Sequence, residues 1–240
     1  TTRPEQLDMA TVRRIVDVSR TLRAELLPWY LRWLFPQVEG VRVCSNAAQW
    51  ELEWREPRSA QLMGLALQAD PQARVAVRVH PVDHPCFHAD VQTIVGRAAS
   101  RLCHVMLPKV ESLSDLDMAV QAIDQAGGKA LPVHALIESP LAVHRAFDIA
   151  AHPRLQSLSF GLMDFVSAHG GAIPSVGLGV QGQFTHPLVV RAKLEIASAC
   201  HAHGKVPSHS VITEFSDTEA MRLAARRASR EFGFTRMWSI

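Results

Sequence analysis

From residue 74 onward, short runs of apolar residues alternate with longer stretches in which apolar positions recur every three or four residues. The short runs predict buried strands, and the longer stretches predict amphipathic helices. Strands that alternate with helices are typical of a parallel sheet built from β/α units. Strands are predicted at residues 74–81, 101–112, 130–140, 155–165 and 205–211, and one more begins in TRMWSI at 235–240.

Helices are predicted between and after these strands. Apolar positions recur at i, i+4 and i+7 from Leu116, and Ser114 with Asp117 predicts a capping pair at the start of that helix. Ser216 and Glu219 have the same spacing ahead of the last helix. The other helices are predicted near residues 141–151, 187–203 and 217–232.

The first 73 residues follow a different pattern. Residues 4–27 have the length and periodicity of an amphipathic helix, and the first strand signal is at residues 40–45. Four tryptophans form two pairs with a spacing of four residues, Trp29 with Trp33 and Trp50 with Trp54. Each pair is expected to share a helix face. Packing of these faces on the outside of the domain is favoured over a contact between subunits.

Composition narrows the function classes. The chain has 240 residues, 48% of them hydrophobic, which is enough for one sizeable domain. A net charge of +2 without runs of like charge argues against a nucleic-acid partner. Four cysteines without a C-x-x-C pair indicate reduced thiols in the cytoplasm. Since no apolar run reaches about 18 residues and the N-terminus is charged, neither a membrane span nor a signal peptide is expected.

Charged residues close several of the predicted strands: Arg78, Lys109, Glu111, Glu138 and Asp164. In a β/α barrel the active site forms at the carboxyl ends of the strands, so these side chains are expected to converge. Glu138 and Asp164 close consecutive strands, and two adjacent buried carboxylates repel unless a proton or cation lies between them. Mg²⁺ suits one or two carboxylates plus waters. A buried ion pair of Glu138 with Arg78 or Lys109 is the alternative.

Four segments in this order carry a family resemblance: VRVHP at 77–81, VMLPKVES at 105–112, ALIESP at 135–140 and LSFGLMDF at 158–165. They resemble the CitE-like branch of the HpcH/HpaI aldolase and citrate lyase β-subunit family, whose segments read VRxNP, hxLPKxE, hxIEx and hxFGxxD. Four ordered motifs are more specific than one short pattern. The resemblance covers about residues 74–240.

The resemblance implies an α/β fold of the TIM (β/α)8 barrel type, assembled as a homotrimer or hexamer. It implies a single domain over residues 1–240, with an atypical N-terminal region at 1–73 and a family-like barrel segment at 74–240. Family members open with an RSxLFxPG strand and a second strand ending in DLED, neither of which is visible in residues 1–73. A divergent or incomplete N-terminal part is therefore expected.

The implied activity is Mg²⁺-dependent cleavage of a 3-hydroxyacyl-CoA, such as citramalyl-CoA or malyl-CoA, into an acyl-CoA and an α-keto acid. On this resemblance Glu138 and Asp164 hold the metal, and Arg78 binds substrate and stabilises the enolate oxygen. Lys109 and Glu111, in the PKxE motif, orient Arg78 or a metal-bound water.

Substrate contacts are further expected at Gly161 and Pro140, within the motifs, and at His209, where many family members carry Asp or another polar residue.

Two other functions stay open. One is an aldolase acting on free hydroxy-keto acids. The other is a non-catalytic barrel that serves as a binding or assembly subunit, with the aromatic N-terminal region facing a partner.

Histidines cluster in HPVDHPCFH, where His80, His84 and His88 are four residues apart. On a helix this spacing would suit zinc, but the two prolines of the segment disfavour a continuous helix. A loop with surface histidines is predicted instead.

Overall fold

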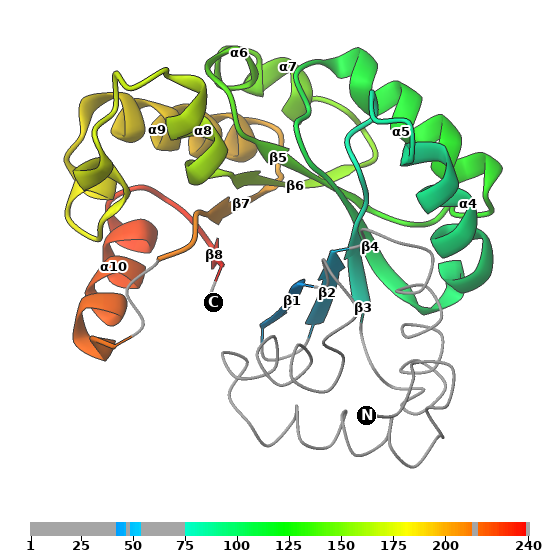
Figure 1. The fold of residues 1–240 in the computed structure, drawn as a ribbon, viewed down its shortest axis with the longest axis horizontal. Coiled ribbons are helices and arrows are strands. Elements are labelled where there is room, and N and C mark those ends of the chain that lie inside the picture. The colour runs from blue at the N-terminus through cyan, green and yellow to red at the C-terminus, as the bar shows by residue number, and fades with distance from the viewer. Residues whose placement is uncertain (1–41, 47–48, 54–74, 213–215, 239–240) are drawn as a thin grey trace. The chain divides into compact units, whose positions relative to one another are not determined.

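The structure is a computed structural model that describes residues 42–46, 49–53, 75–212 and 216–238 (Figure 1). The predicted helix at 4–27 and the pair Trp29 and Trp33 lie outside the described residues. The chain divides into two compact units. The described part of the first comprises residues 42–46, 49–53, 75–105 and 121–131, and that of the second comprises 106–120, 132–212 and 216–238.

The first unit contains three paired strands. β1 (Arg42–Asn46) runs antiparallel to β2 (Gln49–Glu53), and β2 runs parallel to β3 (Val75–Arg78), with Glu53 opposite Arg78. The strands predicted near residues 40–45 and 74–81 are therefore confirmed. The strand at β2 was not predicted, and the expectation that Trp50 lies on a helix face is wrong.

Helix α4 (Phe87–Ala98) follows β3, and a short 3₁₀ turn η3 (Ala99–Arg101) leads into β4 (Leu102–Leu107). The buried residues of α4 recur at helical spacing from Phe87 through Val91 to Ile94 and Val95, so one apolar stripe covers the core. β4 and the following helix α5 (Leu113–Gln125) each belong partly to both units.

The second unit is built on four parallel strands in the order of the chain: β5 (Val133–Ile137), β6 (Leu155–Phe160), β7 (Val206–His209) and β8 (Arg236–Met237). Every residue of β5 is buried, as expected for a parallel strand that is covered on both faces. The α/β class and the alternation of strands with helices are confirmed.

The helices of this unit lie between and after these strands. They are α6 (Pro140–His144), α7 (Ala146–Ala150), α8 (Leu162–Ala168), α9 (Pro187–Ala202) and α10 (Thr218–Arg230), with 3₁₀ turns η4 (Ser175–Leu178) and η5 (Gly182–Phe184). α9 packs against β6 and β7 and against α7. None of the helices in the described residues is both long and apolar enough to span a bilayer.

Several predicted boundaries are wrong. The strands predicted at 101–112 and 155–165 end at Leu107 and Phe160, and the helix predicted at 141–151 is divided into α6 and α7 at Arg145. The strand predicted at 130–140 is confined to β5.

Both predicted capping pairs are also wrong, because neighbouring residues cap the two helices instead. At α5 the Asp115 carboxylate accepts the backbone N–H of Ser112 at 2.9 Å, and Ser112 Oγ accepts the N–H of Asp115 at 3.3 Å. Asp217 is the N-cap residue of α10.

Candidate active site

Glu138 is a buried carboxylate directly after β5. Only 7% of the residue is exposed, and Oε1 accepts a hydrogen bond of 3.1 Å from the backbone N–H of Lys109. Burial of a carboxylate costs several kcal/mol unless hydrogen bonds or opposite charge compensate. The fold therefore places an ionisable group at this strand end, with a backbone donor directed at it.

That donor requires an unusual backbone conformation. Lys109 is the one non-glycine residue among those described with a positive φ, 52°. The left-handed conformation costs an L-residue roughly 1–2 kcal/mol. It lies two residues after the end of β4, where it turns the Lys109 N–H toward Glu138. Strain of this kind is often concentrated at functional sites.

Gly161, directly after β6, lies against the side chain of Glu138. Its N–H donates to the carbonyl of Ile137 at 3.0 Å, so the two strand ends remain side by side. A Cβ built on Gly161 would overlap Glu138 Cγ and would lie 2.9 Å from the carboxyl carbon. Glycine is thus required here by the close approach of the carboxylate, which gives Gly161 a packing role next to the predicted metal ligand.

Asp164 lies in the first turn of α8, after the end of β6, so its predicted place at a strand end is wrong. A carboxylate is favoured there by the helix dipole. The Asp164 side chain is 56% exposed, and its Oδ1 is 4.0 Å from Lys109 Nζ. One predicted metal ligand is therefore buried and the other is open to solvent. Lys109 contacts both of them, through its amide and its ammonium group.

Glu111 is tied to the residue that follows Glu138. Ser139 Oγ donates to Glu111 Oε2 at 2.7 Å and accepts the N–H of Ala142 at 3.0 Å as the N-cap of α6. Pro140 occupies the first position of that helix, where its fixed φ is favourable, and it is exposed. Glu111 thus stabilises the turn that follows Glu138. The position of Pro140 is explained by its place at the start of α6, and its predicted contact with substrate stays a prediction.

Arg78 is the last residue of β3, as predicted, and it is partly exposed. It belongs to the first unit, whereas Glu138 and Asp164 belong to the second. A common pocket for the three side chains stays a prediction.

His209 ends β7 but faces the interior. It is fully buried, its ring stacks on Phe184 at 5.3 Å between centroids, and its Nδ1 donates to the Ser210 carbonyl at 2.9 Å. Burial, followed by the charge of Lys193, lowers the pKa of His209 to about 3. The ring is therefore a neutral core group without exposed atoms for the substrate contact that was predicted.

Lys193 is a fully buried lysine that sequence reasoning missed. Its Nζ lies 4.0 Å from the centroid of Phe184, and it has no hydrogen-bond partner among the described residues. Burial, with a smaller effect from Arg227, lowers the pKa of Lys193 to about 6, so the amine is neutral at pH 7.5. A signal existed in the sequence, because Lys193 has helical spacing with the apolar residues Val189 and Ile196.

The donor set fits an ion such as Mg²⁺. No group of three or more His, Cys, Asp or Glu side chains in the described ranges is arranged to hold a metal. Mg²⁺ does not require one, since it commonly takes one or two carboxylates and keeps several waters. Glu138, anchored by Lys109 and Gly161, and the exposed Asp164 are the residues that would hold it.

Comparison with known proteins identifies the family of this chain. Residues 59–239 match the HpcH/HpaI aldolase/citrate lyase family. The L-malyl-CoA/beta-methylmalyl-CoA lyase of Cereibacter sphaeroides is 33% identical over 181 residues, which cover 69% of this chain and 56% of the relative. The chain thus spans little more than half of the length of that relative.

Two solved structures extend the comparison. A citrate lyase from Burkholderia xenovorans is 41% identical, with a TM-score of 0.73 and coverage of 91% of this chain and 70% of that one. The citrate lyase beta subunit of Mycobacterium tuberculosis, complexed with oxaloacetate and magnesium, is 22% identical, has a TM-score of 0.61 and covers 79% and 80%. The second likeness shows the fold alone. Because the family match takes in more than half of the sequence, the chain belongs to the HpcH/HpaI aldolase/citrate lyase family.

Proposed function

We propose that this chain is a Mg²⁺-dependent carbon–carbon lyase that cleaves a 3-hydroxyacyl-CoA of the malyl-CoA or citramalyl-CoA type into an acyl-CoA and an α-keto acid. The observation that carries the proposal is the Glu138 carboxylate, buried after β5 and held by the Lys109 N–H. Support comes from the relative named as a malyl-CoA lyase and from the related structure that contains magnesium and oxaloacetate.

In this proposal Glu138 and Asp164 hold the ion, which when bound supplies Lewis acidity toward the keto-acid half of the substrate. Lys109 fixes the Glu138 carboxylate through its amide and lies beside Asp164 through its ammonium group. Glu111 fixes the turn after Glu138 through Ser139. These groups act by positioning, so their removal should affect metal affinity before it affects the fold.

We assign substrate binding to Arg78. Its guanidinium would bind the thioester oxygen and stabilise the negative charge that develops there when the carbon–carbon bond breaks. The same proposal includes the closure of an eight-stranded barrel, a single domain over residues 1–240, and assembly as a homotrimer or hexamer.

The test is product analysis with purified protein, L-malyl-CoA and citramalyl-CoA, and the CoA-free acids as parallel substrates. The expected products are acetyl-CoA with glyoxylate or pyruvate, formed with Mg²⁺, abolished by EDTA and restored by added Mg²⁺. Release of free CoA with the intact hydroxy acid would show thioester hydrolysis and contradict the proposal. Turnover of the CoA-free acids alone would favour the aldolase, and no turnover would favour a binding subunit.

A further inference from the structure

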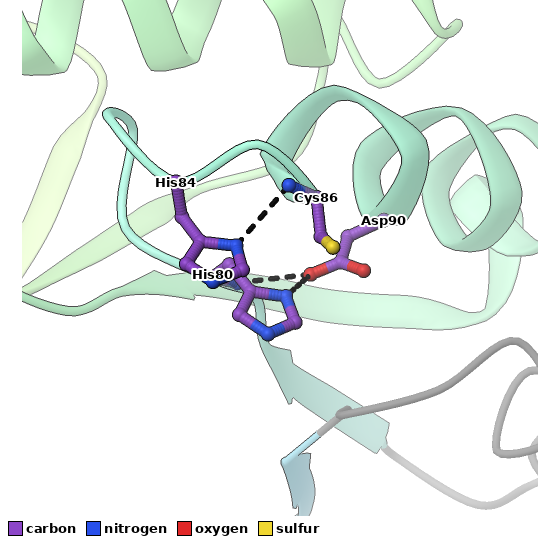
Figure 2. A network of polar contacts seen from close by, with 4 residues as sticks. All are labelled: His80, His84, Cys86 and Asp90. Carbon is purple, nitrogen blue, oxygen red and sulfur yellow. Dashed lines mark hydrogen bonds and ion pairs between the residues drawn. The ribbon is translucent and has the colours of Figure 1, made fainter.

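A histidine and an aspartate form a closely coupled pair directly after β3 (Figure 2). His80 donates to Asp90 Oδ2 twice, from its backbone N–H at 2.9 Å and from Nδ1 at 2.5 Å. Asp90 lies in the first turn of α4. Both side chains are largely enclosed, at 18% and 14% exposure, but neither is sealed from solvent.

These two bonds determine the tautomer of His80. A carboxylate oxygen accepts, so Nδ1 carries the hydrogen and neutral His80 presents the lone pair of Nε2. Nε2 lies on the side of the ring away from Asp90 (Figure 2), and it makes no hydrogen bond within the part of the chain that is described. A carboxylate that orients an imidazole in this way leaves Nε2 ready to take a proton, as in the serine protease triad.

His84 holds the ring of His80 in place. The two rings stack with centroids 4.1 Å apart and planes within 9°. His84 Nδ1 accepts the N–H of Cys86 at 3.1 Å, so His84 is present in the neutral tautomer with its hydrogen on Nε2. A hydrogen bond of 2.9 Å from the His84 N–H to the Pro81 carbonyl closes the turn. The predicted loop with surface histidines is confirmed for His84, which is exposed, but His80 is fixed and mostly enclosed.

His80 lies on the same side of the chain as Arg78. Burial alternates over this segment, with Val77 and Val79 buried and Arg78 and His80 partly exposed. Side chains two residues apart in an extended chain face the same side. His80 is therefore next to the residue to which the proposed function assigns the enolate oxygen, within the same unit.

We propose that His80, oriented by Asp90, is the proton-transfer group of this chain, an inference that rests on the proposed lyase function. In cleavage, Nε2 takes the proton of the C3 hydroxyl as that C–O bond becomes a carbonyl. The C2–C3 bond breaks, and its electron pair forms the thioester enolate. His80 then returns the proton to C2, which gives the acyl-CoA and regenerates neutral imidazole without another reactant.

The test compares His80→Ala and Asp90→Asn with His88→Ala, a matched control on an exposed histidine of the same segment. Two rates are measured, carbon–carbon cleavage of the 3-hydroxyacyl-CoA and the exchange of acetyl-CoA methyl hydrogens with D₂O. His80→Ala should lower kcat by about 10²- to 10⁴-fold and suppress the exchange to a similar degree. Added imidazole should restore part of both rates, and Mg²⁺ affinity should stay within a factor of three.

A second measurement does not depend on the stability of a variant. Nitrogen NMR of the wild-type histidine rings should show His80 protonated at Nδ1 and unprotonated at Nε2. The opposite tautomer would overturn the proposal. Cleavage and exchange that persist in His80→Ala would overturn it while leaving the lyase function in place. A wild-type chain that neither cleaves nor exchanges any thioester would overturn both.

Discussion

Two regions of the second unit bury an ionisable side chain, but the surroundings of the two side chains are opposite. Glu138 lies at a strand end, receives the N–H of Lys109 and lies against a glycine that leaves room for its carboxylate. Lys193 lies on the inner side of α9, over the ring of Phe184, and no acceptor among the described residues reaches its amine. The first group accepts a hydrogen bond that favours its charged form, and burial drives the second to its neutral form.

On the proposed function, the difference separates a group that serves the chemistry from one that the fold tolerates. Holding Glu138 requires a strained residue and a specific glycine, which is expected where a metal or substrate makes use of the charge. Lys193 has no such support. Its burial lowers stability, and no hydrogen bond within the described residues compensates for it. Changes at the first region should therefore affect function, and changes at the second should affect stability.

The largest effect is expected from Gly161→Ala. The new methyl group would overlap Glu138 Cγ, so the carboxylate must move. We expect Mg²⁺ affinity, measured by calorimetry, to fall by about 100-fold or more, with a parallel loss of lyase activity. Gly179→Ala is the control, since a Cβ there would lie 3.5 Å from its nearest neighbour, an ordinary contact. Equal metal affinity in the two variants would refute the packing role of Gly161.

The next effect is a gain of stability in Lys193→Met. The folded pKa of Lys193 is lowered to about 6 from an ordinary value of 10.5, so between these pH values the unfolded state binds one more proton than the folded state. Stability therefore rises with pH across this window, by about 1.4 kcal/mol per pH unit from this group, and the penalty is largest below pH 6. Methionine has no titratable group, so it removes this penalty.

At pH 7.5 we expect Lys193→Met to raise the free energy of unfolding by roughly 2–4 kcal/mol and to flatten its rise between pH 6.5 and 10. Urea unfolding at several pH values measures both. Lys129→Met, at an exposed position, should change stability by about 0.5 kcal/mol or less. A destabilised Lys193→Met with an unchanged pH slope would show that the amine is charged and paired in the folded protein.

A smaller change is expected from His209→Asp, which places a carboxylate beside Lys193. Both side chains lie against the ring of Phe184, and the charge of Lys193 lowers the pKa of His209. An acid at this position should raise the pKa of Lys193 and reduce the rise of stability above pH 6. The net stability should shift by less than about 2 kcal/mol, because burying an ion pair offsets much of its attraction. His209→Asn, which adds no charge, should keep the slope of the wild type.

The smallest effect concerns Lys109. Its ammonium group and the Asp164 carboxylate are 4.0 Å apart and both more than half exposed, so this pair contributes at most about 1 kcal/mol. Lys109→Gly removes the pair and also relieves the strain of the positive φ, whereas Lys109→Ala keeps the strain. We expect the glycine variant to be about 1 kcal/mol more stable than the alanine variant in thermal unfolding. Equal stability would mean that the backbone relaxes to a negative φ.

Much of the second unit could be predicted from the sequence, because its strands are continuous apolar runs separated by helical periodicity. Glu138 was placed correctly since the apolar run of β5 ends at it. Asp164 was misplaced because the apolar run continues past Phe160 into Leu162 and Met163, so strand and helix look alike in this segment. The capping pair at α5 was misplaced because Ser112 with Asp115 and Ser114 with Asp117 have the same spacing.

Other features depend on contacts that spacing does not encode. The bond between His80 and Asp90 joins residues ten apart, and it forms because a turn brings the start of α4 back to the end of β3. Lys193 is a single polar residue on an apolar helix face, and only the packing of Phe184 and Phe232 around it shows that its amine does not reach solvent.

The most direct measurement is the binding of Mn²⁺, as a spectroscopic substitute for Mg²⁺, by electron paramagnetic resonance. It would be carried out on the wild-type chain, Glu138→Gln and Asp164→Asn, with Asp148→Asn as an exposed control. The account predicts one ion per wild-type chain, displaced by Mg²⁺, with affinity lowered about 100-fold or more in both site variants and unchanged in the control. Wild-type affinity in Glu138→Gln would contradict it.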